Sequence, residues 1–194
     1  MTYENRKIKS VVCSHITDCT FLNCDFSDRD YSETVFLKCF FENCNMKNAK
    51  FNSGKFINCT FINCKLKNAS LFLTEAISGK LMGINFTEIN IKGTVFSKCD
   101  LSYCNFRGTD FQKADFSDSR LTGTDFTECN LKEALIENSD LRETLFIKAD
   151  LRGASLKGSQ LSKTSFEDAK IKGLKMNMNQ ALYYSQFCGI VTED

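Results

Sequence analysis

Several residue types are missing or rare in this chain of 194 residues. It contains no proline and no tryptophan, and His15 is its one histidine. The absence of proline fits a fold whose segments all donate backbone N–H groups to a neighbour, because proline has no N–H to donate. A catalytic triad, a histidine general base or a metal site would have to be built around one histidine, and no glycine-rich phosphate loop is present. We therefore predict no catalytic residue, no metal ligand and no cofactor.

The chain also lacks a hydrophobic run long enough to span a bilayer, and it shows no charged-then-apolar leader. Its 25 Lys and Arg residues nearly balance 24 Asp and Glu residues, which leaves a net charge of +1. We expect a soluble, cytoplasmic protein that is not an enzyme and has neither a membrane nor a nucleic acid as its partner.

Large apolar side chains recur at every fifth position. From Ile16 to Ile171 all 32 of these positions except Ala76 carry one, and 15 of the 18 phenylalanines fall among them. The residue two places earlier is small at 29 of 32 positions, the exceptions being Arg29, Ile84 and Ile89. A period of five fits neither a helix nor a flat strand. The backbone must turn a corner every five residues and return to the same face after four corners.

The pattern is clearest at residues 99–126, and it predicts an inward-facing core. The core positions that we predict around this stretch are Phe96, Leu101, Phe106, Phe111, Phe116, Leu121 and Phe126.

A unit of a small residue, then Asp or Asn, then Leu or Phe, then two variable residues resembles the repeat of the pentapeptide-repeat protein family. The resemblance covers roughly residues 11 to 175 and implies an all-β fold, a right-handed quadrilateral β-helix with one coil per 20 residues. We expect a solenoid of about eight coils over residues 1–175, followed by a C-terminal helical cap or dimerisation segment over residues 176–194.

Nine of the 11 cysteines occupy the small inward positions. Their spacings in multiples of 20 residues predict two ladders on adjacent faces, and a free cysteine packs there as a small hydrophobe. Oxidation within a ladder is geometrically conceivable, but we favour reduced, packing cysteines in a cytosolic protein. Cys13 and Cys188 lie outside this register and are the likelier reactive thiols.

Acidic residues gather in the later coils. The segment from Asp100 to Asp150 has 11 Asp and Glu residues against six Lys and Arg residues. One reading is that Asp before the large residue serves the turns of the repeat. The other is a negative stripe that imitates the phosphates of nucleic acid. The candidate partner-facing residues are Asp100, Asp110, Asp115, Asp118, Asp125, Asp140 and Asp150.

Two further features leave alternatives open. Leu37, Ile57 and Ile77 are one coil apart and should line up, either as scattered apolar residues or as a contact surface. Residues 72–90 break the pattern, because Ala76 is too small and Ile84 and Ile89 are too large for their positions. Local distortion with compensating volumes, such as Ile84 filling space beside Ala76, is favoured over a bulge that shapes a binding face.

The tail leaves the repeat and predicts a helix of about three turns, with Asn177 or Asn179 as N-cap and Gly189 as C-cap. Gln180, Ala181, a seven-residue stretch ending at Cys188, then Gly189 and Ile190 resemble the tail of quinolone-resistance (Qnr-like) pentapeptide-repeat proteins. That resemblance implies homodimerisation through the tail, although a simple cap for the last coil is the alternative. The residues that it implicates are Ala181, Leu182, Tyr184, Phe187, Cys188 and Ile190.

The resemblance implies a DNA-mimicking rod that binds DNA gyrase or topoisomerase IV and relieves fluoroquinolone poisoning. The near-neutral charge opposes it, because mimicry relies on a negative field. The alternative is a non-catalytic scaffold that binds an unrelated partner through the apolar residues of the first coils.

Overall fold

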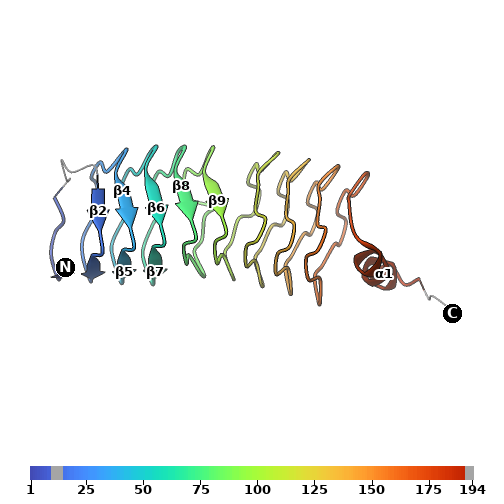
Figure 1. Cartoon of the computed structure of the whole chain (residues 1–194). Coiled ribbons are helices and arrows are strands. Elements are labelled where there is room, and N and C mark those ends of the chain that lie inside the picture. Colours follow the sequence, from blue (N-terminus) through green and yellow to red (C-terminus); the bar gives the residue numbers. More distant parts are fainter. Residues whose placement is uncertain (10–14, 191–194) are drawn as a thin grey trace.

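The chain forms a rod of stacked coils with a helix at one end (Figure 1). This arrangement is seen in a computed structural model that describes residues 1–9 and 15–190. Residues 20 apart pair in parallel along the rod, from His15↔Val35 to Ser155↔Lys175. The predicted β-helix with a short C-terminal helix is therefore confirmed.

Regular strands are short and concentrate in the first half of the rod. One sheet has the order β1-β3-β5-β7 and the other has the order β2-β4-β6-β8-β9. The first sheet consists of β1 (Thr2–Glu4), β3 (Thr20–Leu22), β5 (Phe40–Glu42) and β7 (Thr60–Ile62). The second consists of β2 (His15–Thr17), β4 (Val35–Leu37), β6 (Lys55–Ile57), β8 (Glu75–Ile77) and β9 (Val95–Ser97). The remaining faces are joined by single parallel bridges.

A left-handed residue makes each corner of the coil. The residue two places after each large core residue has a positive φ at every position from Asp18 to Gly173 except Glu88. Glycine adopts this conformation freely and Asn and Asp adopt it more readily than other residues, and these three types are common at the corners. The corner positions thus complete the five-residue unit, although the sequence pattern of large and small residues does not include them.

The interior is a column of aromatic and aliphatic side chains. Phe21, Phe41 and Phe61 stack one coil apart, with ring centroids 5.1 and 4.7 Å apart. The seven predicted core residues from Phe96 to Phe126 are all buried. Each coil buries its apolar centre against its neighbours, which is how a repeat protein is stabilised without a separate globular core.

The cysteines of the small register pack into this core as free thiols. Eight of the nine are buried and Cys64 is half-buried, while Cys188 is exposed and Cys13 lies outside the described residues. The Cys59 Sγ donates to the carbonyl oxygen of Phe36 over 3.3 Å. Burial raises the pKa of Cys104 and of Cys129 to about 12, so these two thiols stay protonated at neutral pH.

The ladder of backbone hydrogen bonds is intact at Ala76 but fails at residues 85–95, at the end of the irregular segment and just beyond it. Among the described residues, no backbone bridge joins Lys65 to Asn85, Asn90 to Asp110, or Val95 to Asp115, although the corresponding positions elsewhere pair regularly. The Asn68 N–H donates instead to the Glu88 carbonyl oxygen over 2.9 Å. Elsewhere the N–H of a corner residue donates to the carbonyl oxygen of the residue 19 places later. The bond from Asn68 reaches 20 places, so the pairing between these two coils is shifted by one residue.

A small cavity persists beside Ala76. Its volume is about 10 Å³, and its lining includes Phe56, Leu81 and Phe96. Ile84 is buried but does not line this cavity, so the compensation of Ala76 by Ile84 stays a prediction. The segment is distorted, and the distortion leaves unfilled space.

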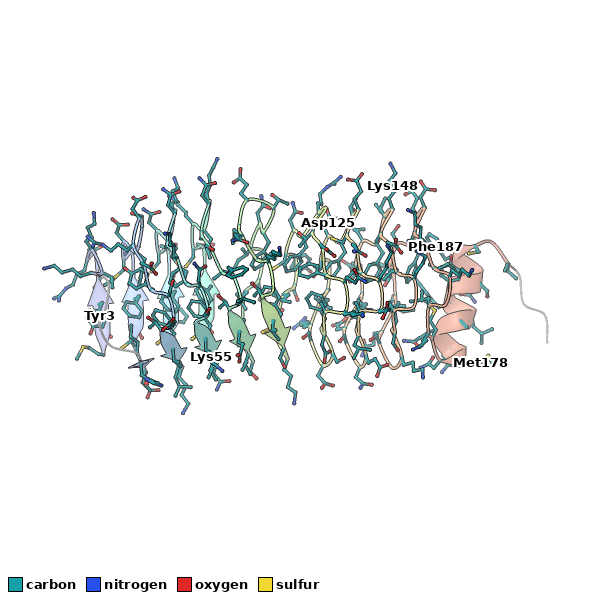
Figure 2. The ribbon with its side chains drawn as sticks, turned by 90° about the horizontal axis from the view of Figure 1, so that it is seen from above. Tyr3, Lys55, Asp125, Lys148, Met178 and Phe187 are labelled. Carbon is teal, nitrogen blue, oxygen red and sulfur yellow. The ribbon has the colours of Figure 1, made fainter. Side chains whose placement is uncertain are left out.

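Helix α1 (Met178–Phe187) closes the last coil. Asn177 is its N-cap and forms a capping box with Gln180, while Gly189 follows Cys188 with φ of 76°. Met178 and Phe187 lie at the end of the rod in Figure 2. In the described part of the chain, no helix has the length and apolarity that crossing a membrane requires.

Candidate functional site

The aspartates that precede large core residues take part in the turns of the coil. Oδ1 of Asp100 accepts from the N–H and the hydroxyl of Ser102, at 3.1 and 2.6 Å. Oδ1 of Asp115 accepts from the N–H of Ser117 over 2.9 Å. These are the local side-chain-to-backbone bonds typical of Asx turns. The structural role of the repeated Asp is therefore real, and a binding role has to be argued from charge and exposure.

Two of the predicted acidic residues are clamped by arginines from their own turns. Arg142 donates to both carboxylate oxygens of Asp140, at 2.8 and 2.6 Å. Arg152 binds Asp150 in the same way, at 2.8 and 2.7 Å. These bidentate hydrogen bonds lower the pKa of each carboxyl to about 2. Both carboxylates are charged at neutral pH, but their field is compensated locally.

Further pairs reduce the negative field in the same coils. Nη1 of Arg107 lies 3.7 Å from the Asp125 carboxylate. Asp100 lies in a ladder between Lys80 and Arg120. Asp110 accepts from the side-chain amide of Asn130 over 2.8 Å. The stripe of seven aspartates predicted from the sequence is therefore largely interleaved with basic and neutral partners.

One acidic cluster is not paired with basic side chains in the described part of the chain. Asp115, Asp118 and Glu137 lie on one face, where the Asp118 N–H donates to the Glu137 carbonyl oxygen over 2.9 Å and Asp115 bridges to the neighbouring Leu135. Within the described residues, none of the three acidic side chains forms an ion pair. We call these three residues the acidic patch. Glu137 was missed in the sequence because only Asp residues were considered as candidates. Its position is 20 residues after Ser117, so the spacing places it one coil above the turn that contains Asp115 and Asp118.

An apolar column lies on the same side of the earlier coils. Leu37 pairs with Ile57, and Ile57 pairs with Ile77, as the 20-residue spacing predicts. All three are half-buried. The column ends at Ser97, the partner of Ile77 in β9, so it covers three coils and does not continue into the acidic half of the rod.

The C-terminal residues both cap the rod and leave an apolar surface. Gln180 is buried, with 5% of the residue exposed. Its Nε2 donates to the carbonyl oxygens of Leu156 and Ser159, at 2.5 and 2.7 Å. Tyr184 packs edge-on against Phe166, with ring centroids 5.3 Å apart. The residues of the predicted dimer surface that remain exposed are Ala181, Leu182, Phe187, Cys188 and Ile190. Of that predicted set, Tyr184 belongs to the cap.

No metal centre is evident in the part of the chain that the structure describes. Within residues 1–9 and 15–190, no group of three or more His, Cys, Asp or Glu residues is arranged to hold a metal ion. The acidic patch, the apolar column and the exposed face of α1 are the candidate contacts for other macromolecules that the described surface offers.

Family comparisons agree with this architecture. A model of the pentapeptide repeat region matches residues 77–146, and a model of eight pentapeptide repeats matches residues 129–168. Together with the square coils, these matches show that residues 77–168 carry pentapeptide repeats and that the chain has the pentapeptide-repeat fold. A search of curated proteins gave no match.

Solved structures with similar folds include QnrB1 and HetL. Full-length QnrB1, a plasmid-mediated fluoroquinolone resistance protein, is 22% identical with a TM-score of 0.71, and 97% of each chain is covered. HetL, which is involved in heterocyst differentiation regulation in the cyanobacterium Nostoc sp. strain PCC 7120, is 15% identical with a TM-score of 0.63. That alignment covers 91% of this chain and 87% of HetL. At these identities the likeness concerns the fold.

Proposed function

We propose that this protein is a non-catalytic rod that binds DNA gyrase or topoisomerase IV in place of DNA and protects the enzyme from fluoroquinolones. The observation that carries the proposal is the similarity to QnrB1 along the whole rod, with 97% of each chain covered. The stacked coils form an elongated rod (Figure 1), as a DNA duplex does. The proposed site of action is the cytoplasm.

The acidic patch is the proposed point of electrostatic contact. Asp115, Asp118 and Glu137 form no ion pair among the described residues, whereas Asp140 and Asp150 are neutralised by arginines 2.6 and 2.7 Å away. Unpaired surface charges act over about 8 Å at physiological salt and steer association. We therefore assign recognition to the patch, although Asp115 also accepts a turn bond from Ser117 as the paired aspartates do in their own turns.

The exposed face of α1 is the proposed homodimer contact. Leu182, Phe187 and Ile190 are 43%, 44% and 56% exposed at the end of the rod. Apolar side chains gathered at one end favour burial against a second copy. Two rods joined at these ends would present two acidic patches to a two-fold symmetric enzyme.

A gyrase supercoiling assay with and without ciprofloxacin tests the proposal. The full-length protein should restore supercoiling in the presence of the drug. The triple variant Asp115→Asn, Asp118→Asn, Glu137→Gln should need about tenfold more protein for the same rescue, because it loses three steering charges. A protein that neither rescues nor inhibits at micromolar concentration would overturn the proposal for that gyrase.

A matched control separates a local contact from net charge. Glu128→Gln, Glu167→Gln, Asp168→Asn changes the net charge by the same amount on another face of the rod. Its rescue should match that of the unmodified protein. Equal losses in both triple variants would show that total charge, and not the acidic patch, determines binding.

The second candidate function is a scaffold that binds a protein through the apolar column. The alignment of Leu37, Ile57 and Ile77 over three coils favours it. Salt distinguishes the two functions, because an electrostatic contact weakens as salt rises and an apolar contact does not. A protein partner whose affinity is constant between about 50 and about 300 mM salt and is lost in Ile57→Ser would favour the column over the patch.

A further inference from the structure

One face of the rod has an open rung between two coils. In a regular coil, the N–H of Asn85 would donate to the Cys64 carbonyl oxygen, and the N–H of Leu66 would donate to the Asn85 carbonyl oxygen. Neither bond is formed between these described residues, although Lys65 pairs with Cys44 on one side over 2.9 Å. The edge of each coil therefore presents backbone donors and acceptors to the gap.

The neighbouring faces keep this gap small. Thr60 bridges to Lys80 on the preceding face, and Ser70 bridges to Asn90 on the following face. Two coils that are held together five residues before and five residues after the gap cannot separate far enough to admit another strand, which needs about 4.8 Å on each side. The gap can hold a small group but no additional β-strand.

Oversized residues explain why the rung is open. Ile84, next to Asn85, and Ile89 occupy positions where the repeat has small residues, and both are buried. Between them, Glu88 is the one corner residue from Asp18 to Gly173 without a positive φ. We attribute the displaced coil edge to these two side chains, because core packing tolerates little added volume.

The open rung forms the floor of a surface cleft of about 440 Å³. This volume is in the range of small-molecule sites. Its apolar wall includes Phe61, Leu66, Met82 and Ile84. Met82 is 48% exposed, so the cleft offers an accessible apolar surface beside unpaired backbone N–H groups.

The rim of the cleft is positively charged. Lys47, Lys65 and Lys67 line it, together with one acidic residue, Glu88. Lys67 lies 3.5 Å from Glu88, whereas Lys47 and Lys65 form no ion pair among the residues that the structure describes. The local balance of three lysines against one glutamate favours an anion.

We propose that this cleft binds a small organic anion, a carboxylate attached to an apolar body. The carboxylate would accept hydrogen bonds from the N–H groups of Leu66 and Asn85, with Lys65 as its counter-charge. The apolar body would lie against Phe61 and Met82. A bare inorganic anion would leave the apolar wall exposed, and a neutral apolar ligand would leave the lysines and N–H groups without a partner.

Octanoate is the probe for this site. Acetate, which has the carboxylate without the long apolar chain, and octanol, which has the chain without the charge, are the matched controls. Titration of the full-length protein, followed by ¹H–¹⁵N correlation spectra, should show one saturable site with the largest shifts at the amides of Leu66 and Asn85. Octanoate should bind about tenfold more tightly than either acetate or octanol, because only octanoate uses both the charge and the wall. Equal affinity for octanol, or shifts centred elsewhere on the rod, would overturn the proposal.

Two variants test the assigned contacts. Lys65→Met should weaken octanoate binding about tenfold while it keeps the length of the side chain. Lys148→Met removes an outward-pointing lysine in the later coils (Figure 2) and should leave the affinity unchanged. Both side chains are exposed, so both variants should fold. Unchanged affinity in Lys65→Met, or an equal loss in Lys148→Met, would show that this lysine is not the counter-charge.

Discussion

Filling the cavity beside Ala76 should stabilise the rod, and the best replacement should differ from the repeat consensus. Ala76 is 3% exposed and pairs with Phe56 and Phe96 on the neighbouring coils. The sequence pattern alone suggests Phe at this position. The structure offers a cavity of only about 10 Å³, which is room for about one water molecule. We therefore expect Ala76→Val to stabilise the protein and Ala76→Phe to destabilise it.

The magnitudes follow from the added volume. Valine adds two carbons, and burial contributes about 0.8 kcal/mol for each. Part of this gain is lost to imperfect fit, so the net stabilisation should be about 1 kcal/mol. Valine also suits β8, because β-branched side chains favour strands. Phenylalanine adds a whole ring to the same space, and overpacking costs about 1–3 kcal/mol.

Urea denaturation followed by circular dichroism measures both effects. Ala76→Val should raise the transition midpoint at unchanged slope. Ala76→Ser is a useful control, because it adds an atom of similar size that needs a hydrogen-bond partner in an apolar cavity and should therefore destabilise. Stabilisation by Phe beyond that by Val would refute the reasoning, since it would require a space much larger than the one described.

Two further predictions concern pH and the C-terminal cap. Asp140 and Asp150 have pKa values lowered to about 2, so their contribution to stability is present above pH 4 and is lost as the pH falls towards 2. The test is the urea transition midpoint measured from pH 5 to pH 2. In the double variant Arg142→Met, Arg152→Met, the midpoint should fall less steeply with pH than in the unmodified protein. An equally steep fall would show that the two ion pairs contribute nothing to stability. Gln180→Leu should lower the free energy of local unfolding of α1 by about 1–3 kcal/mol, because two carbonyl oxygens lose a buried hydrogen-bond donor. Amide exchange should then accelerate in α1 while the central coils stay protected; uniform acceleration along the rod would contradict a local cap.

Much of the fold was predictable because one spacing determines it. The five-residue register identified the core positions from Phe96 to Phe126, and each is buried. It also aligned Leu37 with Ile57. Residues 20 apart in the sequence lie one above the other because no insertion shifts the register. The tail helix was predictable from its N-cap Asn177 and from Gly189, although the C-cap is Cys188 and Gly189 follows it with a positive φ.

The candidate sites were less predictable because they depend on side chains that meet across coils. Whether an aspartate is clamped, as Asp140 is by Arg142, depends on rotamers that the register does not specify. The effect of Ile84 depends on how far a coil edge moves to accommodate two extra carbons or more. Sequence spacing says that a residue is too large for its position; it does not say which hydrogen bond will break.

The interrupted ladder has a mechanical consequence for the rod as a whole. Where the coil of β9 meets the next coil, backbone bridges are missing on two adjacent faces, and the Phe96 and Phe116 rings lie 6.2 Å apart. On the opposite side, Phe86 and Phe106 are only 4.6 Å apart. The junction is therefore a wedge, and Figure 1 shows the wider step after β9. A repeat protein is held together only by contacts between neighbouring repeats. This junction has fewer such contacts, so under load the rod should bend there first, with the coils on either side moving as two stiff halves about a hinge.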